Sequence, residues 1–336
     1  MENNQAPLSV ETVNFLVARR EKTEIRRLAS YIGFAYLIMT AIPYVWAVVV
    51  SVFASRFGFS ADVIFSLTED DAVQHLLQIV LSSVMFLFPY LLALTGDGRK
   101  LSEVASFKKP NRELILPLIF IAVGFCAFAN IATNSISAFF SLFGIPLSAP
   151  EMPRPDGLFG LILMFLSISV TPALVEEFAM RGVVLGTLRR FGDGFAIAVS
   201  SVIFAMVHCN FVQIPFAFMV GVALSFAVIK TGSIWTGVII HFFNNFFSLC
   251  LDTLFERVPS MVAQTIITSV YFALCFTCFF IGLVMLRNKK NDIWKTEAPT
   301  MITKTGNKLG IFFSSPIIIV DIIITVIISV AYIFIS

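Results

Sequence analysis

The sequence predicts an all-α, polytopic membrane protein with eight or nine transmembrane helices. Of its 336 residues, 58% are hydrophobic and only 13% are charged, and the mean hydropathy is +0.91. A water-soluble domain of this composition would leave a large apolar surface exposed. Apolar stretches of about 20 residues, the length that crosses a hydrocarbon core about 30 Å thick, recur along the chain.

Nine stretches have the length and composition of membrane spans. The first follows a polar, charged tail, which favours a true first span over a cleaved signal peptide. The others follow in close succession, so we expect no sizeable soluble domain between them. The nine stretches are residues 31–54, 75–95, 114–142, 158–180, 194–211, 213–229, 233–251, 261–286 and 310–335.

The distribution of Lys and Arg predicts the orientation of these spans. Loops on the cytoplasmic side of a membrane protein carry an excess of basic residues. With an inside N-terminus, all of the 23 basic residues except Arg56, Arg154 and Arg257 fall on the cytoplasmic side. We therefore expect a cytoplasmic N-terminus and, with nine spans, a C-terminus on the opposite side.

The chain divides into four expected parts. Residues 1–30 form a cytoplasmic basic tail, 31–156 the N-terminal scaffold spans, 157–252 a polar helical core, and 253–336 the C-terminal spans. The scaffold spans have almost no ionisable residue in their apolar centres. His75, which follows three acidic residues at the mouth of the second span, is expected to be solvated or interfacial.

Ionisable and amide side chains gather in the third of these parts. An ionisable group at the bilayer centre costs about 2.5–3.5 kcal/mol on insertion scales, so such groups usually face a protein interior or a water-filled cavity. This cost indicates a functional site rather than a packing contact. The side chains concerned are Glu176, Glu177, Arg181, His208, Asn210, His241, Asn244 and Asn245.

The first motif, VEEFAMRG, contains two adjacent carboxylates and a basic residue. Glu177 and Arg181 are four residues apart, so they share one helical face and can form an ion pair. Glu176 is rotated by about 100° from that pair and has no local partner. A carboxylate in this position is suited to general acid–base chemistry. The alternative interpretation is a charge network at a helix end on the cytoplasmic surface.

The second and third motifs, FAMVHCN and HFFNN, supply imidazole and amide groups. Phe204 and His208 share a helical face, as do His241 and Asn245. A single intramembrane histidine can simply bridge two helices. A carbonyl attacked by water, however, needs a base for the water and donors for the developing oxyanion, and these side chains together provide both.

The segments EEFAMRG, FAMVHCN and KTGSIWTGVIIHFFNN together resemble the motifs of the CPBP family of intramembrane proteases, the CAAX-processing and Abi-type group related to the Ras-converting enzyme. The resemblance covers residues 157–252. It departs from the family pattern at Met180, where an aromatic residue is common, and at Thr236, where proline is common. It implies an endopeptidase of a bacterial cell membrane that hydrolyses a peptide bond in a lipidated, CAAX-like or hydrophobic membrane peptide.

The resemblance also implies a role for each polar position. Glu176 and His208 would activate a water molecule, and His241 and Asn245 would stabilise the oxyanion. The expected supporting residues are Glu177, Arg181 and Phe204.

The favoured interpretation needs no cofactor. Zinc is the alternative, because Glu176, His208 and His241 are all possible ligands, although the chain has no H-E-x-x-H helix. The expected partners are a membrane-bound or lipidated peptide and the lipid bilayer, without nucleic acid.

Two other functions fit the same polar residues. A proton-coupled transporter would relay protons through the Glu and His side chains, but it would normally have paired broken spans in two related halves. A catalytically silent immunity or scaffold protein would use the fold only to bind a partner.

Counting along straight helices leaves the depth of His208 unexplained. At about 1.5 Å per residue, Glu176 falls near the cytoplasmic end of its span and His208 near the outer end of the next. Pro172 and Pro215 are the positions where a kink or break could alter this picture.

Overall fold

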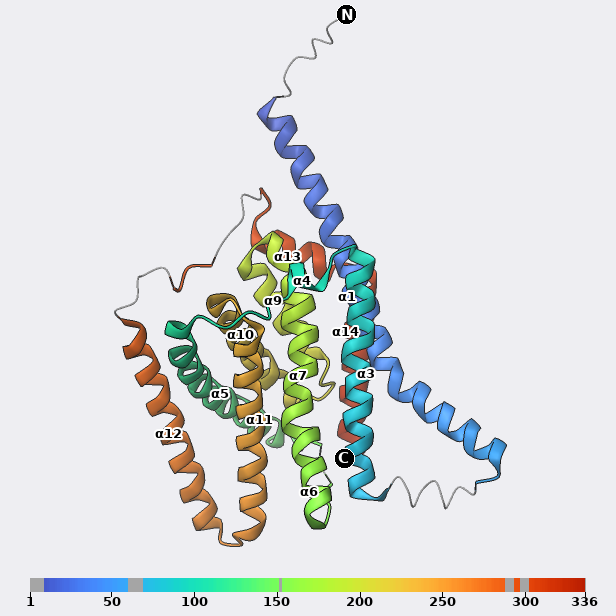
Figure 1. The fold of residues 1–336 in the computed structure, drawn as a ribbon, viewed down its shortest axis with the longest axis vertical. Coiled ribbons are helices and arrows are strands. Elements are labelled where there is room, and N and C mark those ends of the chain that lie inside the picture. The colour runs from blue at the N-terminus through green and yellow to red at the C-terminus, as the bar shows by residue number, and fades with distance from the viewer. Residues whose placement is uncertain (1–8, 60–68, 151–152, 288–292, 297–301, 336) are drawn as a thin grey trace, which may run out of the picture.

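A computed structural model describes residues 9–59, 69–150, 153–287, 293–296 and 302–335. These residues form helices joined by turns and loops, with no strand among them, and they pack as a bundle from which both ends of α1 project (Figure 1). The helices are α1 (Val10–Phe57), α3 (Asp71–Asp97), α4 (Leu101–Val104), α5 (Arg112–Ser141), α6 (Gly157–Phe165), η1 (Leu166–Val170), α7 (Thr171–Glu177), η2 (Phe178–Leu185), α8 (Gly186–Leu188), η3 (Arg189–Phe191), α9 (Asp193–Met206), α10 (Gln213–Thr231), α11 (Ile234–Arg257), α12 (Met261–Arg287), α13 (Thr305–Phe313) and α14 (Pro316–Ile335).

Eight helical stretches in the described part of the chain are long and apolar enough to cross a membrane. The predicted class, an all-α polytopic membrane protein, is therefore confirmed. The stretch 194–211 differs from the other predicted spans, because α9 has only 14 residues. It rises about 21 Å, less than the hydrocarbon core of a bilayer requires.

Several long helices begin at a side chain that caps the free backbone N–H groups of the first turn. Asp70 accepts from Val73 N before α3, and Asn111 accepts from Glu113 N before α5. Ser233 plays the same part before α11, where it accepts from Trp235 N. Such caps fix where a helix starts.

The first helix is longer than the predicted span 31–54. Residues 10–30, predicted as part of a tail, are the first turns of α1, and Ile25 and Leu28 are fully buried there. Glu21 is buried as well, and its carboxylate accepts hydrogen bonds from the backbone N–H groups of Ile302 and Thr303. The predicted tail is thus tied to the loop before α13.

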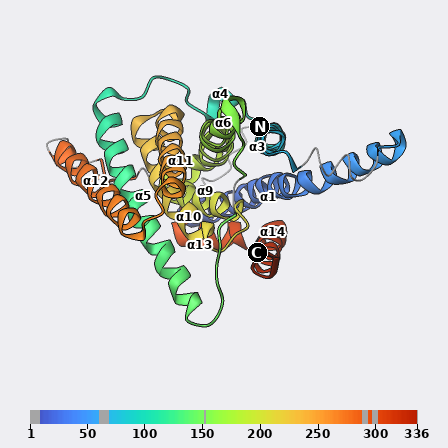
Figure 2. The same ribbon diagram turned by 90° about the horizontal axis from the view of Figure 1, so that it is seen from below.

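The bundle has two apolar cores on either side of the polar residues. One core joins α1 and α3 to η2, α9, α13 and α14, and the other joins α5, α10 and α12. Seen from below, α5 and α12 lie on one side, α1 and α14 on the other, and α6 and α11 between them (Figure 2). The central helices therefore have protein on both sides, as intramembrane polar groups require.

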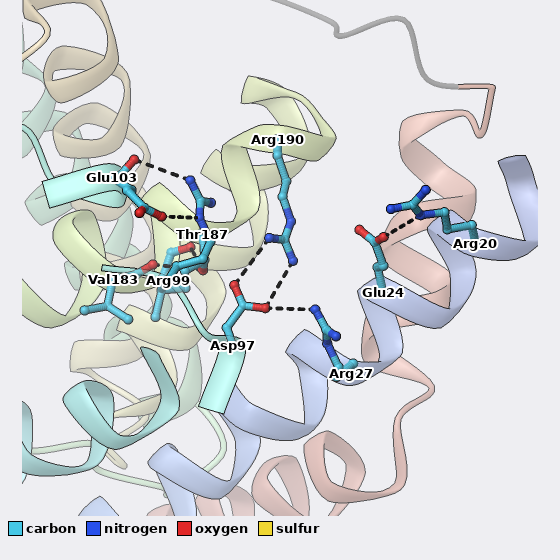
Figure 3. Close-up of polar contacts among 10 residues, drawn as sticks. Arg20, Glu24, Arg27, Asp97, Arg99, Glu103, Val183, Thr187 and Arg190 are labelled. Atoms are coloured by element: carbon cyan, nitrogen blue, oxygen red, sulfur yellow. Dashed lines mark hydrogen bonds and ion pairs between the residues drawn. The ribbon is translucent and has the colours of Figure 1, made fainter. Parts of the chain in front are cut away.

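An ion-pair group ties three elements together at one end of the bundle (Figure 3). Asp97, at the end of α3, contacts Arg27 of α1 at 3.2 Å and Arg190 of η3 at 3.3 Å. The Asp97 side chain is only 1% exposed. Buried charges need such partners, and here one carboxylate serves two guanidinium groups.

Replacing Asp97 with Ala is expected to lower the free energy of unfolding by about 1.5–3 kcal/mol, the range for hydrogen bonds to charged groups. Thermal unfolding of the purified protein in detergent measures the change. Glu103→Ala is the matched control, because the pair between Glu103 and Arg99 is more exposed and exposed pairs contribute about 0–1 kcal/mol. Equal shifts for the two variants would contradict this role of Asp97.

His75 is buried, contrary to the prediction of a solvated or interfacial side chain. Its exposed fraction is 0%. Nδ1 lies 2.7 Å from Ser167 Oγ of η1, and Nε2 lies 2.8 Å from the Pro153 carbonyl oxygen. Both ring nitrogens have partners, and no local pattern predicts these partners because both are distant in the chain.

Candidate active site

The helical stretch that carries the two glutamates is much longer than predicted. It runs without interruption from Gly157 to Phe191, a length of 35 residues, so that Glu176 lies near its middle rather than at its end. Two π-helical segments, η1 and η2, lie on either side of α7. Such segments occur often at functional sites, because the wider turn redirects side chains and carbonyl groups.

The short helix α9 brings His208 to the same part of the bundle. Because α9 ends at Met206, His208 lies in the turn before α10 rather than at the far end of a full span. Glu176, His241 and Arg181 are all close enough to interact with its ring electrostatically. The longer glutamate helix and the shorter α9 together account for the depth mismatch found by counting along straight helices.

Glu177 and Arg181 form the predicted ion pair, and both side chains are fully buried. Arg181 Nη1 lies 2.6 Å from Glu177 Oε1. Arg181 Nη2 also donates to the Gly221 carbonyl oxygen at 3.3 Å, and the guanidinium lies 4.4 Å from the centre of the Phe204 ring. Three neighbours therefore hold the arginine. Its guanidinium group makes no hydrogen bond with Glu176.

His241, on α11, contacts the second glutamate directly. Its Nδ1 lies 3.0 Å from Glu177 Oε1, the same oxygen that accepts from Arg181. Its Nε2 faces Glu176 Oε2 at 3.9 Å, beyond hydrogen-bond distance. Glu177 thus orients the imidazole as well as pairing with the arginine, a contact that helical spacing within one motif cannot predict.

Gly237 makes room for this contact, and sequence reasoning did not identify it. A Cβ atom at Gly237 would overlap Glu177 Oε2. The glycine lies four residues before His241, so it faces the same neighbouring helix. A glycine on the helical face that carries a site residue lets a neighbouring helix approach closely, and this is the signal by which Gly237 could have been found.

Replacing Gly237 with Ala is expected to displace the Glu177 carboxylate and to reduce the activity of the site by about 10²-fold, the effect of a misplacement of about 1 Å. The measurement is the rate of peptide cleavage by the purified variant. Gly194→Ala is the control, because a Cβ there meets no atom within 4 Å. Wild-type activity in Gly237→Ala would show that Glu177 does not need its present position.

The Phe204 ring lies between the two histidines. Phe204 and His208 have ring centres 5.2 Å apart, and Phe204 and His241 are 5.8 Å apart, both edge to face. His208 Nδ1 lies 2.9 Å from the Phe204 carbonyl oxygen, an acceptor, and therefore donates to it. In the neutral ring this leaves Nε2 as the acceptor.

Asn245 is positioned by a proline on the facing helix. Pro172 has no N–H, so the Ile168 carbonyl four residues earlier loses its usual helical donor. Asn245 Nδ2 donates to that carbonyl oxygen at 3.0 Å. Asn245 Oδ1 accepts from Asn244 Nδ2 at 3.1 Å. One N–H of the Asn245 amide remains for another acceptor.

The possible zinc ligands do not form a metal site as they are placed. In the described part of the chain, no group of three or more His, Cys, Asp and Glu side chains lies close enough to hold a metal ion. Glu176, His208 and His241 lie near one another without forming such a group. We therefore assign no step to a metal.

The fold and these contacts define a polytopic membrane protein with a buried acid–histidine–amide site. Residues 158–247 match the family model described as "Type II CAAX prenyl endopeptidase Rce1-like". The chain is also similar to the membrane-embedded CAAX protease MroQ of Staphylococcus aureus (strain USA300), with 34% identity over 94 residues. No solved structure matches the chain.

These matches confirm the resemblance to the CAAX protease family for the central part of the chain. Residues 158–247, which match the Rce1-like family model, contain every predicted site residue. The similar segment covers 26% of this chain and 38% of the staphylococcal protease. Helices α1, α3, α4, α5, α12, α13 and α14 lie outside the segment that matches the family model.

Proposed function

We propose that this protein is an intramembrane endopeptidase that hydrolyses a peptide bond in a lipidated or hydrophobic membrane peptide. The observation that carries the proposal is the position of Glu176 beside two histidines in a buried site of an Rce1-like segment. Its carboxylate is 14% exposed, whereas Glu177 and Arg181 are fully enclosed. Glu176 is thus the carboxylate that a substrate or a water molecule can reach.

In the proposed reaction, Glu176 accepts a proton from a water molecule while His208 Nε2 orients it. The water oxygen bonds to the scissile carbonyl carbon, and the carbonyl oxygen becomes an oxyanion. Glu176 then transfers the proton to the amide nitrogen as the carbon–nitrogen bond breaks. These steps balance the protons within the site, because Glu176 acts first as the base and then as the acid.

His241 and Asn245 are the proposed donors to the oxyanion. Glu176, Glu177 and Arg181 would together leave one net negative charge in a buried site, which is unfavourable in a low dielectric. We propose that His241 is an imidazolium that balances this charge. Its Nδ1–H then donates to Glu177, and its Nε2–H, with the free N–H of Asn245, donates to the oxyanion.

Cleavage by the purified protein tests the function and the absence of a catalytic metal together. Fluorogenic membrane peptides, with and without a prenylated cysteine, are incubated with the protein in detergent. We expect cleavage whose rate changes less than about twofold with a zinc chelator. Loss of activity that added zinc restores would refute the metal-independent mechanism, and failure to cleave either peptide class would count against the proposed function.

A further inference from the structure

The turn that carries His208 has an unfavourable backbone conformation. Cys209, the next residue, has φ = 45°, the one positive value at a non-glycine position among the residues that the structure describes. Such a conformation persists when surrounding contacts fix it. The contacts that hold this turn therefore also fix the position of the His208 imidazole.

Asn210 holds the side of the turn that leads into α10. Its Oδ1 accepts from the backbone N–H groups of Val212 and Gln213, at 2.8 and 3.3 Å. Its Nδ2 donates to the Ser148 carbonyl oxygen at 3.1 Å. The side chain is only 3% exposed, so these bonds are shielded from solvent. Asn210 thereby holds the backbone at the start of α10 and ties the turn to the loop between α5 and α6.

Tyr36 of α1 holds the side of the turn that leaves α9. Its hydroxyl donates to the Met206 carbonyl oxygen at 3.0 Å and lies 3.6 Å from Cys209 Sγ. The Met206 carbonyl also accepts from the Cys209 backbone N–H at 3.1 Å, a bond that closes the turn at the end of α9. The Tyr36 side chain is fully buried, so its hydroxyl adds a second donor to this carbonyl from a different helix.

Thr325 of α14 fixes the hydroxyl of Tyr36 in turn. The two side-chain oxygens are 2.5 Å apart, and Thr325 also contacts the Asp321 carbonyl oxygen at 2.9 Å. Each hydroxyl group carries one proton, so when Tyr36 donates to Met206 its oxygen accepts from Thr325, and the Thr325 proton is then not given to the Asp321 carbonyl oxygen. A chain of hydrogen bonds thus runs from the last membrane helix through the first to the turn that carries His208.

We propose that Tyr36 and Thr325 are positioning residues for His208, so that α1 and α14 complete an active site whose catalytic groups all lie in residues 158–247. The inference rests on the proposed function, because it assigns the two hydroxyl groups to the same reaction. Neither residue touches the reacting atoms. Each acts through the backbone of the turn between α9 and α10.

Single substitutions that remove only a hydroxyl group test this assignment. Tyr36→Phe and Thr325→Val keep the shape of the side chain and break the chain of bonds at two different points. Tyr90→Phe is the matched control, because Tyr90 is another fully buried tyrosine whose hydroxyl has no hydrogen-bond partner among the described residues. The measurements are kcat and KM for cleavage of a fluorogenic membrane peptide.

We expect kcat to fall about 10- to 100-fold in Tyr36→Phe and less in Thr325→Val, with KM changed less than about twofold, because a small misplacement of a catalytic group slows the chemical step. Tyr90→Phe is expected to keep the wild-type kcat. A loss of stability alone would lower the amount of active protein without altering kcat per folded molecule. Wild-type kcat in Tyr36→Phe would overturn the inference and leave the proposed function intact.

A second readout does not depend on cleavage. In a protein whose other four cysteines, Cys126, Cys250, Cys275 and Cys278, are replaced with Ala, the rate of maleimide labelling reports the accessibility of Cys209. We expect labelling several-fold faster in Tyr36→Phe and Thr325→Val than in Tyr90→Phe. If the wild-type protein cleaves no peptide, the proposed function fails, and labelling alone decides whether these hydroxyl groups hold the turn. Equal labelling rates in all variants would then overturn the inference.

Discussion

Replacing Glu176 with Gln is expected to reduce kcat for peptide cleavage by about 10²- to 10⁴-fold, the range that general acid–base catalysis contributes. Glutamine has nearly the same size as glutamate, so the packing around α7 is retained. It cannot accept the proton of the attacking water, however. Single-turnover cleavage of a fluorogenic membrane peptide measures the effect on the chemical step.

The control for this prediction is the folded state of the variant. Glu176 has no hydrogen bond with Arg181 and lies 3.9 Å from His241, so Glu176→Gln is expected to stay folded, with a fall in the thermal unfolding temperature that is small compared with that of Arg181→Met. Glu103→Gln, at an exposed pair near the end of the bundle, is expected to keep full activity. Full activity of Glu176→Gln would mean that this carboxylate is not the base.

The same variant separates the proposed protease from the two other functions. A scaffold or immunity protein that acts only by binding would retain its cellular effect when Glu176 is replaced by Gln. A proton-coupled transporter would acidify or alkalinise the interior of proteoliposomes in a manner that depends on Glu176. Loss of cleavage without any change in proton flux is the outcome that the proposed function requires.

Local patterns in the sequence predicted the class of fold and one contact within the candidate site. The spacing of four between Glu177 and Arg181 predicted an ion pair, and the structure contains it. The apolar stretches predicted membrane helices, and eight are present in the described part of the chain. Both predictions depend on periodicity within one helix, which a single sequence displays directly.

The depth of the site could not be predicted, because it depends on where two helices end. Charged residues such as Arg181 and Arg189 suggested that the glutamate span stops at the membrane surface, yet Arg181 is buried by Glu177 and Phe204. The helix continues past Arg181 to Phe191. Phe204 and the Gly221 carbonyl, which help to enclose the arginine, come from other helices, and no local pattern in the sequence reports these contacts.

Contacts between distant segments were also beyond prediction. Asn245 binds the Ile168 carbonyl, which Pro172 leaves without its usual helical donor, whereas the sequence marked Pro172 only as a position for a kink or break. Tyr36 and Thr325 are separated by most of the chain, and each lies in a stretch that reads as apolar scaffold. A hydroxyl on such a helix has no distinctive pattern until the packing of the helices is known.

Replacing Arg181 with Met is expected to cause the largest loss of stability, about 3–5 kcal/mol, because it leaves the buried Glu177 carboxylate without its guanidinium partner. The double variant Glu177→Gln with Arg181→Met removes both charges and is expected to recover most of that loss, since a neutral pair needs no compensation. Chemical unfolding in detergent, performed as a double-mutant cycle, measures the coupling. If the double variant is as unstable as Arg181→Met alone, the loss comes from the contacts of Arg181 with Gly221 and Phe204. Recovery would instead show that the charge of Glu177 requires the arginine even with His241 beside it.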